Sequence, residues 1–228
     1  MKQFKFLAML LFIAFGMTAC SSSDKDDDKP DAGEVDTRLE SVVPSEYRAQ
    51  LSKYMPIYDG VNPPNVEGVY LASPATLVFA SDGGYDPGHN FEDYYYKFSN
   101  QNTKKNTVDY IKRNIDNSFN ESSTGAFVSG EGNNFTIFFK ATGVASGISI
   151  KNASLVSGTM SAEGIKNLIW AFVMTEKGDD PENKLMKVGA FRVIKDNDGL
   201  AENTAWPSAT RAFEPVFDFS ENSKGIQN

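Results

Sequence analysis

The sequence contains one cysteine, Cys20, and one histidine, His89, so chemistry that needs these side chains depends on single residues. A structural zinc site needs several Cys or His ligands, which the chain does not supply. A Ser-His-Asp nucleophile would have to use His89, which lies between Gly88 and Asn90 in a loop-like stretch. Residues 143–147 place serine one position too late for a Gly-x-Ser-x-Gly elbow. We therefore expect a surface histidine, and neither a catalytic site, a metal nor a cofactor.

Carboxylates are the other groups that could do chemistry. Hydrolysis by acid and base needs only two of them, and 30 acidic residues make accidental pairs unavoidable, so a hydrolase stays a third hypothesis with no pair to name. Residues 196–199 (Asp-Asn-Asp-Gly) have the composition of a calcium loop. Aligning Gly199 with the glycine of such a loop, however, puts Ile194 and Ala205 where oxygen ligands are needed. A tight turn explains this segment better.

Aromatic residues at strand spacing are the remaining candidates for a binding site. Tyr94, Tyr96 and Phe98 alternate with polar or smaller residues and share one face of a strand. Aromatics in this pattern form a core more often than a cavity, but they can also line a pocket or stack on a sugar. We take Tyr96, Phe139 and Trp170 as the candidate ligand-binding residues.

Strands must position these side chains, and strand-like patterns recur from Glu67 onward. The predicted strands are 67–72, 76–80, 93–99, 107–115, 126–129, 135–141, 147–160, 164–176 and 184–195. The segment 107–115 also fits a helix, and we assign it to a strand. An irregularity is expected at Asn152. Residues 164–176 are apolar on both faces, so this strand must be covered on both sides.

A short helix precedes the strands. Val43, Tyr47, Leu51 and Tyr54 recur at helical spacing, which predicts one helix over 43–54 that ends before Pro56. We divide the chain into a lipoprotein signal peptide at 1–19, a disordered acidic tether at 20–40, this helix and its connector at 41–60, and a single β-barrel domain at 61–220. The aromatic tail after residue 206 is expected to pack on the outside or to add an edge strand.

The first residues have the pattern of a secretory signal. Lys2 and Lys5 precede an apolar run over residues 6–17, and Thr18-Ala19 supplies small residues before Cys20. A run of this length is too short for a permanent membrane span, which needs about 20 residues.

The segment 17–20 (Met-Thr-Ala-Cys) resembles the lipobox of bacterial lipoproteins, in which the cysteine is lipidated and becomes the mature N-terminus. Met17 stands where that family usually has Leu. The Ser- and Asp-rich residues 21–29 resemble the export signal of Bacteroides-type surface lipoproteins. These resemblances imply a lipid attached at Cys20 and an outer-membrane protein displayed on the cell surface, with display on the periplasmic face as the second possibility. The alternatives are an ordinary cleaved signal and a tether that is merely solvated.

The charge of the chain restricts its partners. Removing residues 1–19 leaves 20 basic against 30 acidic residues, a net charge of −10. Binding to nucleic acid or to anionic lipid through a basic surface is therefore disfavoured. The expected partners are the membrane, through the lipid anchor, and either a small molecule or a protein of the cell envelope.

Successive strands with short connections favour an all-β, up-and-down antiparallel barrel of eight or nine strands, because closure removes exposed strand edges. A β-sandwich is the runner-up. Gly68-Val69-Tyr70 resembles the Gly-x-Trp start of lipocalin-like barrels, with Tyr70 in the Trp position, and residues 158–195 resemble their later hairpins. The resemblance implies a non-enzymatic protein that binds a small apolar or sugar ligand at the barrel mouth. The alternative is a structural or adaptor module that docks an envelope protein through its helix or its aromatic tail.

Overall fold

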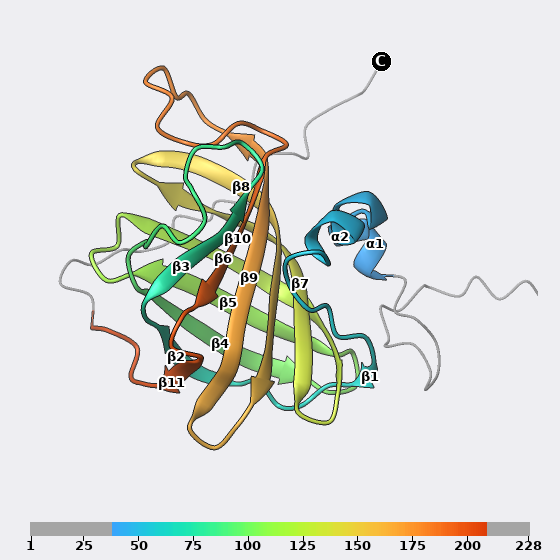
Figure 1. Ribbon diagram of the computed structural model, residues 1–228. Helices are drawn as coiled ribbons and strands as arrows, with labels where there is room; N and C mark the ends of the chain where they lie inside the picture. Colours follow the sequence, from blue (N-terminus) through green and yellow to red (C-terminus); the bar gives the residue numbers. More distant parts are fainter. Residues whose placement is uncertain (1–37, 209–228) are drawn as a thin grey trace, which may run out of the picture.

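Two helices and eleven strands follow one another along residues 38–208, the part of the chain that the computed structural model describes (Figure 1). The helices are α1 (Arg38–Val42) and α2 (Ser45–Leu51). The strands are β1 (Val61–Asn62), β2 (Gly68–Ala72), β3 (Ala75–Ala80), β4 (Tyr94–Asn102), β5 (Thr107–Asn114), β6 (Phe119–Glu131), β7 (Asn134–Ala145), β8 (Ile148–Met160), β9 (Gly164–Lys177), β10 (Phe191–Asp196) and β11 (Leu200–Asn203).

Eight of these strands form a closed antiparallel ring in the order β2-β4-β5-β6-β7-β8-β9-β11, so the expected all-β barrel is confirmed. Strands β4 to β9 make a continuous meander between neighbours in sequence. The ring closes where the start of β9 pairs with β11, and β11 in turn pairs with β2. The short β1 lies beside β6 in parallel, outside the ring.

Along one edge, strand β9 pairs with two different strands. The start of β9 pairs with β11, while its later half, around Trp170, pairs with β10. Strand β10 pairs with β3, and β3 is bonded in turn to residues 88–91, where Leu77 N donates to His89 O and Phe91 N donates to Ala75 O, both at 2.8 Å. Strands β10 and β3 thus extend the wall at the end of the barrel away from β11.

The barrel interior is filled with side chains over most of its length. Large rings from several strands meet there, and their centroids lie about as far apart as ring packing requires: Tyr110 and Phe139 at 4.1 Å, Tyr96 and Trp170 at 5.5 Å. Tyr70, in the middle of β2, is 2 % exposed and donates a hydrogen bond from its hydroxyl to Glu67 O at 3.0 Å.

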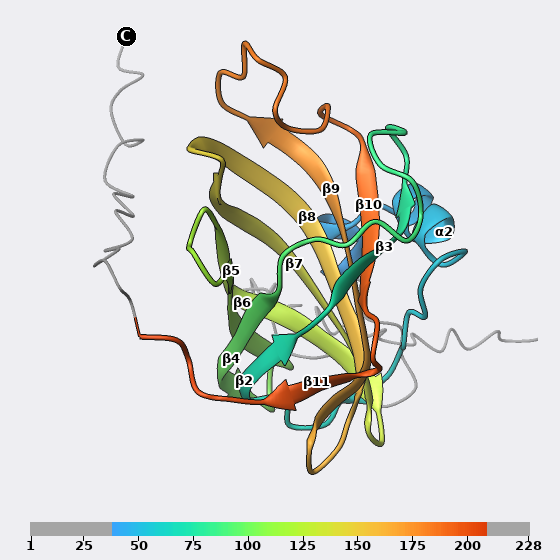
Figure 2. The same cartoon turned by 60° about the vertical axis from the view of Figure 1, so that its left-hand side comes forward.

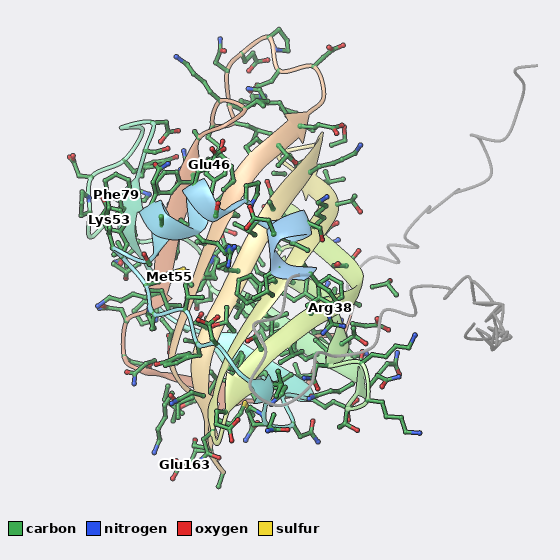
Figure 3. The ribbon with its side chains drawn as sticks, turned by 90° about the vertical axis from the view of Figure 1, so that its right-hand side faces the viewer. Arg38, Glu46, Lys53, Met55, Phe79 and Glu163 are labelled. Carbon is green, nitrogen blue, oxygen red and sulfur yellow. The ribbon has the colours of Figure 1, made fainter. Side chains whose placement is uncertain are left out.

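A second core lies on the outer face of the same sheet. Strand β9 presents Leu168 and Trp170 to the interior, and Ile169, Ala171 and Val173 to the outside, where the helical segment covers them. Figure 3 shows the helices lying across the outer faces of the strands, with Glu163 of the β8–β9 hairpin at the far end of the molecule. The expectation that 164–176 is covered on both sides is therefore confirmed.

The helical segment differs from its prediction. Within the range 43–54, where one helix was expected, only α2 is helical, and the additional helix α1 precedes Val43 and Pro44 and begins inside the segment 20–40 that we expected to be a tether. Pro44 has φ −51° and ψ 146°, so its extended backbone interrupts the helix. The apolar side chains of this segment, Leu39, Val42, Val43, Leu51 and Met55, are buried on the sheet.

Two strand predictions were wrong in their bounds. Strand β6 covers Phe119–Glu131 rather than 126–129, because Ser, Thr and Gly in its middle hide the pattern and a register shift against β7 interrupts it. Strand β10 covers Phe191–Asp196 rather than 184–195, since residues 184–190 turn back over the barrel end. The assignment of 107–115 to a strand and the irregularity at Asn152, where the β8–β9 register shifts, are confirmed. The lipid attachment at Cys20 and the tail from residue 209 lie outside the described residues.

Gly164 offers a test of ring closure. It has φ +147°, and a Cβ added there would lie 2.2 Å from Ala201 O of β11. Gly164→Ala must therefore displace β11 from β9, and we expect it to lower the free energy of unfolding by about 3 kcal/mol. Gly132→Ala is the control, because Gly132 also has a positive φ (+62°) but open space around it, so about 1 kcal/mol is expected. Equal losses in urea denaturation would contradict the close approach.

Candidate functional site

One end of the barrel carries a pocket of about 340 Å³, which we call the mouth pocket. The turns β5–β6 and β7–β8 and the long segments 81–93 and 178–190 all lie at this end, as the antiparallel order requires, and Figure 2 shows the β9–β10 segment standing above the strands. The pocket wall combines apolar side chains, among them Phe91, Phe119, Ile150, Phe172 and Met186, with polar ones. The polar side chains are Glu92, Lys112, Asn114, Ser118, Ser146, Asn152, Lys184 and Arg192.

Lys112 is the unusual member of this set. Its side chain is 2 % exposed, although it lines the pocket. It belongs to the inward face of β5, where it follows Val108 and Tyr110 at two-residue intervals. Aromatic rings surround the ammonium group, and the ring centroids of Tyr94, Phe119 and Trp170 lie 4.7, 4.8 and 5.3 Å from Nζ. These contacts offset part of the desolvation of the charge.

Glu121 of β6 is the counter-charge. Its carboxylate is 3 % exposed, and its Oε1 lies 3.4 Å from Lys112 Nζ. The same oxygen accepts the hydroxyl proton of Tyr110 at 2.7 Å, and Oε2 accepts Asn152 Nδ2 at 3.0 Å. Three donors, the Lys112 amine, the Tyr110 hydroxyl and the Asn152 amide, therefore converge on one carboxylate. This network of Lys112, Glu121, Tyr110 and Asn152 joins three strands beneath the pocket.

Burial changes the acidity of the network. Desolvation lowers the pKa of the Lys112 ammonium, and Glu121 opposes this change by favouring the charged amine. Burial also raises the pKa of the Tyr110 hydroxyl well above its usual range, and the negative charge of Glu121 adds to the effect. Tyr110 is thus a neutral donor to Glu121 at all pH values at which the protein would function. A buried, charged group with a shifted pKa at a cleft is the usual sign of a functional site.

The rim of the pocket has its own aromatic cluster. Tyr85 and His89 stack with their ring centroids 4.2 Å apart, and Phe91 meets the His89 ring edge-on at 4.9 Å. The guanidinium of Arg192 lies 4.9 Å from the Tyr85 centroid and pairs with Asp82 at 3.2 Å. His89 is exposed, as expected, and serves here as a packing partner of Tyr85 and Phe91.

The three residues predicted from the sequence to bind a ligand, Tyr96, Phe139 and Trp170, lie inside the barrel. None of them lines the mouth pocket. Tyr96 and Trp170 lie directly beneath it, since their rings face Lys112 Nζ at 5.6 and 5.3 Å. Phe139 packs deeper, against Tyr110. Two residues that sequence reasoning missed, Lys112 and Glu121, form the polar centre. A signal for one of them was present, because the alternation within 107–115 puts Lys112 on the same face as Val108 and Tyr110.

Three buried polar atoms near the network have no hydrogen-bond partner among the described residues. They are the Tyr96 hydroxyl, Trp170 Nε1 and Asn152 Oδ1. Asn152 lines the mouth pocket, so its free oxygen can accept a hydrogen bond from a bound molecule. Buried polar groups without a partner are uncommon, and they mark the places where a ligand or an ordered water completes a site.

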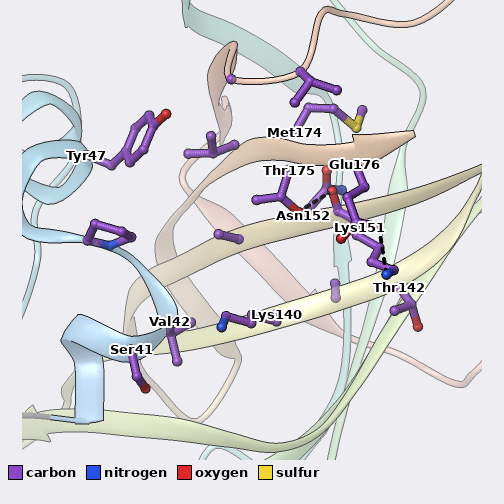
Figure 4. Close-up of a pocket in the computed structure, with 16 residues that line it drawn as sticks. Ser41, Val42, Tyr47, Lys140, Thr142, Lys151, Asn152, Met174, Thr175 and Glu176 are labelled. Carbon is purple, nitrogen blue, oxygen red and sulfur yellow. Dashed lines mark hydrogen bonds and ion pairs between the residues drawn. The ribbon is translucent and has the colours of Figure 1, made fainter. Parts of the chain in front are cut away.

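A second hollow lies on the outside of the barrel, between the helical segment and strands β7 to β9 (Figure 4). This outer groove has a volume of about 610 Å³. Tyr47 of α2 lies on one side, and Lys140 and the Lys151–Glu176 ion pair, at 2.7 Å, lie on the other. Its charged side chains are solvent-exposed, and nothing in the described part of the chain shows what would cover it.

Comparison with protein-family models, with curated proteins and with solved structures found no match. Between residues 38 and 208 no helix is long and apolar enough to span a membrane. Nor do those residues bring together three or more His, Cys, Asp or Glu side chains that could hold a metal ion. The fold and the site therefore define the class, a closed eight-stranded β-barrel with an aromatic pocket and a buried ion pair at its mouth.

The bond from Tyr110 to Glu121 leads to a matched pair of predictions. Tyr110→Phe removes a donor to a buried carboxylate and should lower the free energy of unfolding by about 1.5–3 kcal/mol. Tyr96→Phe removes a hydroxyl that has no hydrogen-bond partner within residues 38–208 and should cause no loss, or a small gain. Both rings are buried and lie 6.2 Å apart, so they share an environment.

Urea denaturation of the two variants beside the wild type measures the difference. A Tyr96→Phe loss as large as that of Tyr110→Phe would show that the carboxylate network is not what stabilises this region.

Proposed function

We propose that the protein is a non-enzymatic, lipid-anchored protein of the outer membrane that binds a small apolar or sugar ligand in the mouth pocket of a lipocalin-like barrel. The observation that supports the proposal is the composition of the pocket, in which aromatic side chains lie beside Lys112 and Asn152, and both of these contact Glu121 beneath the pocket. Ligand sites combine mainly apolar walls with a few fixed polar groups in this way.

The polar groups favour a ligand that both donates and accepts hydrogen bonds. In its ammonium form Lys112 can only donate, Asn152 Oδ1 can only accept, and both residues line the pocket. Phe119 and Phe172 offer flat apolar faces beside them. A sugar ring, with hydroxyl groups on its edge and C–H groups on its face, matches this arrangement. An apolar ligand with one polar end uses the same walls.

The pocket can be tested with a thermal-shift screen of the full chain in detergent against monosaccharides, disaccharides and short-chain apolar acids and alcohols. A compound at 100 times its Kd stabilises the folded state by about 2.7 kcal/mol, which raises the melting temperature measurably. We expect Phe119→Ala to abolish this shift, because the ring forms part of the pocket wall.

Phe127→Ala is the control for this variant. Phe127 is on the same strand and equally half-buried, but it lies on the outer face, where Arg38 packs over its ring at 4.5 Å. A ligand whose shift survives in Phe119→Ala, or is lost in both variants, would argue against binding in the mouth pocket. A screen without any stabilising compound would count against the ligand proposal as a whole.

The anchor has an independent test. Metabolic labelling with a radioactive fatty acid should mark the wild-type protein and not Cys20→Ala, because Cys20 supplies the only thiol of the chain. Label on both proteins would refute lipidation at this residue. Protease treatment of intact cells then separates display on the cell surface, where the protein is digested, from display on the periplasmic face, where it is protected.

A further inference from the structure

The amine of Lys112 combines three properties that seldom occur together. It is almost fully buried, it borders a pocket large enough for a small organic molecule, and it has a carboxylate at 3.4 Å that is fixed by other donors. A buried ion pair of this kind adds little to stability compared with apolar packing, so stability alone does not explain a charged amine at the pocket. Lysine amines in such surroundings act as nucleophiles towards carbonyl groups.

We propose that Lys112 captures small aldehydes that enter the mouth pocket, by forming an imine between its Nζ and the carbonyl carbon. This inference rests on the proposed function, because it uses the same pocket, and it assigns a chemical class of ligand, an aryl or unsaturated aldehyde. It adds a covalent step to what would otherwise be reversible binding.

The step balances without any further reactant. The neutral amine of Lys112 attacks the carbonyl carbon, and a C–N bond forms while the carbonyl π bond opens to give a carbinolamine. The carbinolamine oxygen then leaves as water, and this water carries away the two hydrogens of the original amine. One C=N bond replaces one C=O bond, and no atom is oxidised or reduced.

The burial of Lys112 favours the neutral amine, which is the nucleophilic form of the side chain. Desolvation lowers the pKa of Lys112, and each unit by which the pKa falls raises the fraction of neutral amine about tenfold at a neutral pH. Lys184 lines the same pocket but is exposed, with 51 % of its side chain accessible, and it is paired with Glu182 at 3.0 Å. Two lysines of one pocket therefore differ in burial and form an internal comparison.

Glu121 acts on the product through its charge. Its Oε1 lies beside Nζ, and Tyr110 and Asn152 hold the carboxylate in place. An imine is protonated more readily when a fixed anion lies next to its nitrogen, so Glu121 stabilises the iminium form of the adduct. The rings of Tyr94, Phe119 and Trp170 around Nζ provide the same favourable environment for a delocalised cation.

The experiment treats the full chain in detergent with trans-cinnamaldehyde and sodium cyanoborohydride at pH 7, and then maps the reduced adducts by peptide mass spectrometry. We expect one adduct per chain at low aldehyde concentration, on Lys112, formed at least about ten times faster than the adduct on Lys184. Equal labelling of the two lysines, or labelling of Lys184 first, would overturn the proposal. The wild-type protein decides this result alone, so it does not depend on whether a variant folds.

Variants of Lys112, Lys184 and Glu121 then test the contribution of each side chain to the adduct. Lys112→Met should remove the fast adduct, whereas Lys184→Met should leave it unchanged. In Glu121→Gln the adduct should still form, but the long-wavelength absorbance of the protonated imine should vanish at a lower pH than in the wild type. An unchanged absorbance titration would show that Glu121 has no part in stabilising the iminium form.

Cinnamyl alcohol separates the failure of this inference from the failure of the proposed function. It has the shape of the aldehyde but cannot form an imine, so its thermal shift, and its ability to protect Lys112 from labelling, report reversible binding in the pocket. A shift with the alcohol and no adduct with the aldehyde would overturn the covalent step and leave the binding site intact. Fast labelling of Lys112 that the alcohol does not slow would overturn the pocket as the route to the amine.

Discussion

Strand β9 is the constraint on which the rest of the structure depends. It is apolar on both faces, so the chain must bury one face inside the barrel, around Leu168 and Trp170, and the other under α1 and α2, around Ile169 and Val173. The same strand must also satisfy backbone hydrogen bonds on two edges. It does so with β8 along one edge and with β11 and then β10 along the other. Ring closure and helix docking therefore follow from one strand.

The change of partner along one edge of β9, from β11 to β10, also explains at which end of the barrel a pocket can form. At the β11 end, the interior is packed with the buried rings of Tyr70, Phe98 and Phe135. At the other end, β10 and β3 carry the wall beyond the ring, and the strands of the meander end in turns. The extra wall encloses the mouth pocket, whose floor is the upper layer of the packed interior, with Trp170 and Tyr96 in contact with Lys112.

A charged network at this floor is costly in a fold that otherwise fills its interior with apolar side chains. Glu121 is paired with Lys112 and held by two further donors, which is the arrangement that makes a buried carboxylate tolerable. Apolar residues of similar size would pack there without that cost. The interior thus has a lower part that is packed with apolar and aromatic side chains and an upper part with a polar network, which under the proposed function faces the ligand.

The sequence by itself determined the strand class, most strand positions and the two-sided burial of 164–176, because alternation and apolar runs are local properties. It also led to Tyr96 and Trp170, which border the polar centre from below. Only the tertiary structure decided that Lys112 and Glu121 meet, that β9 changes partners between β11 and β10, and that 184–190 is a turn. A lysine and a glutamate on different strands, nine residues apart, carry no sign in sequence of facing each other, since cross-strand register decides which side chains meet.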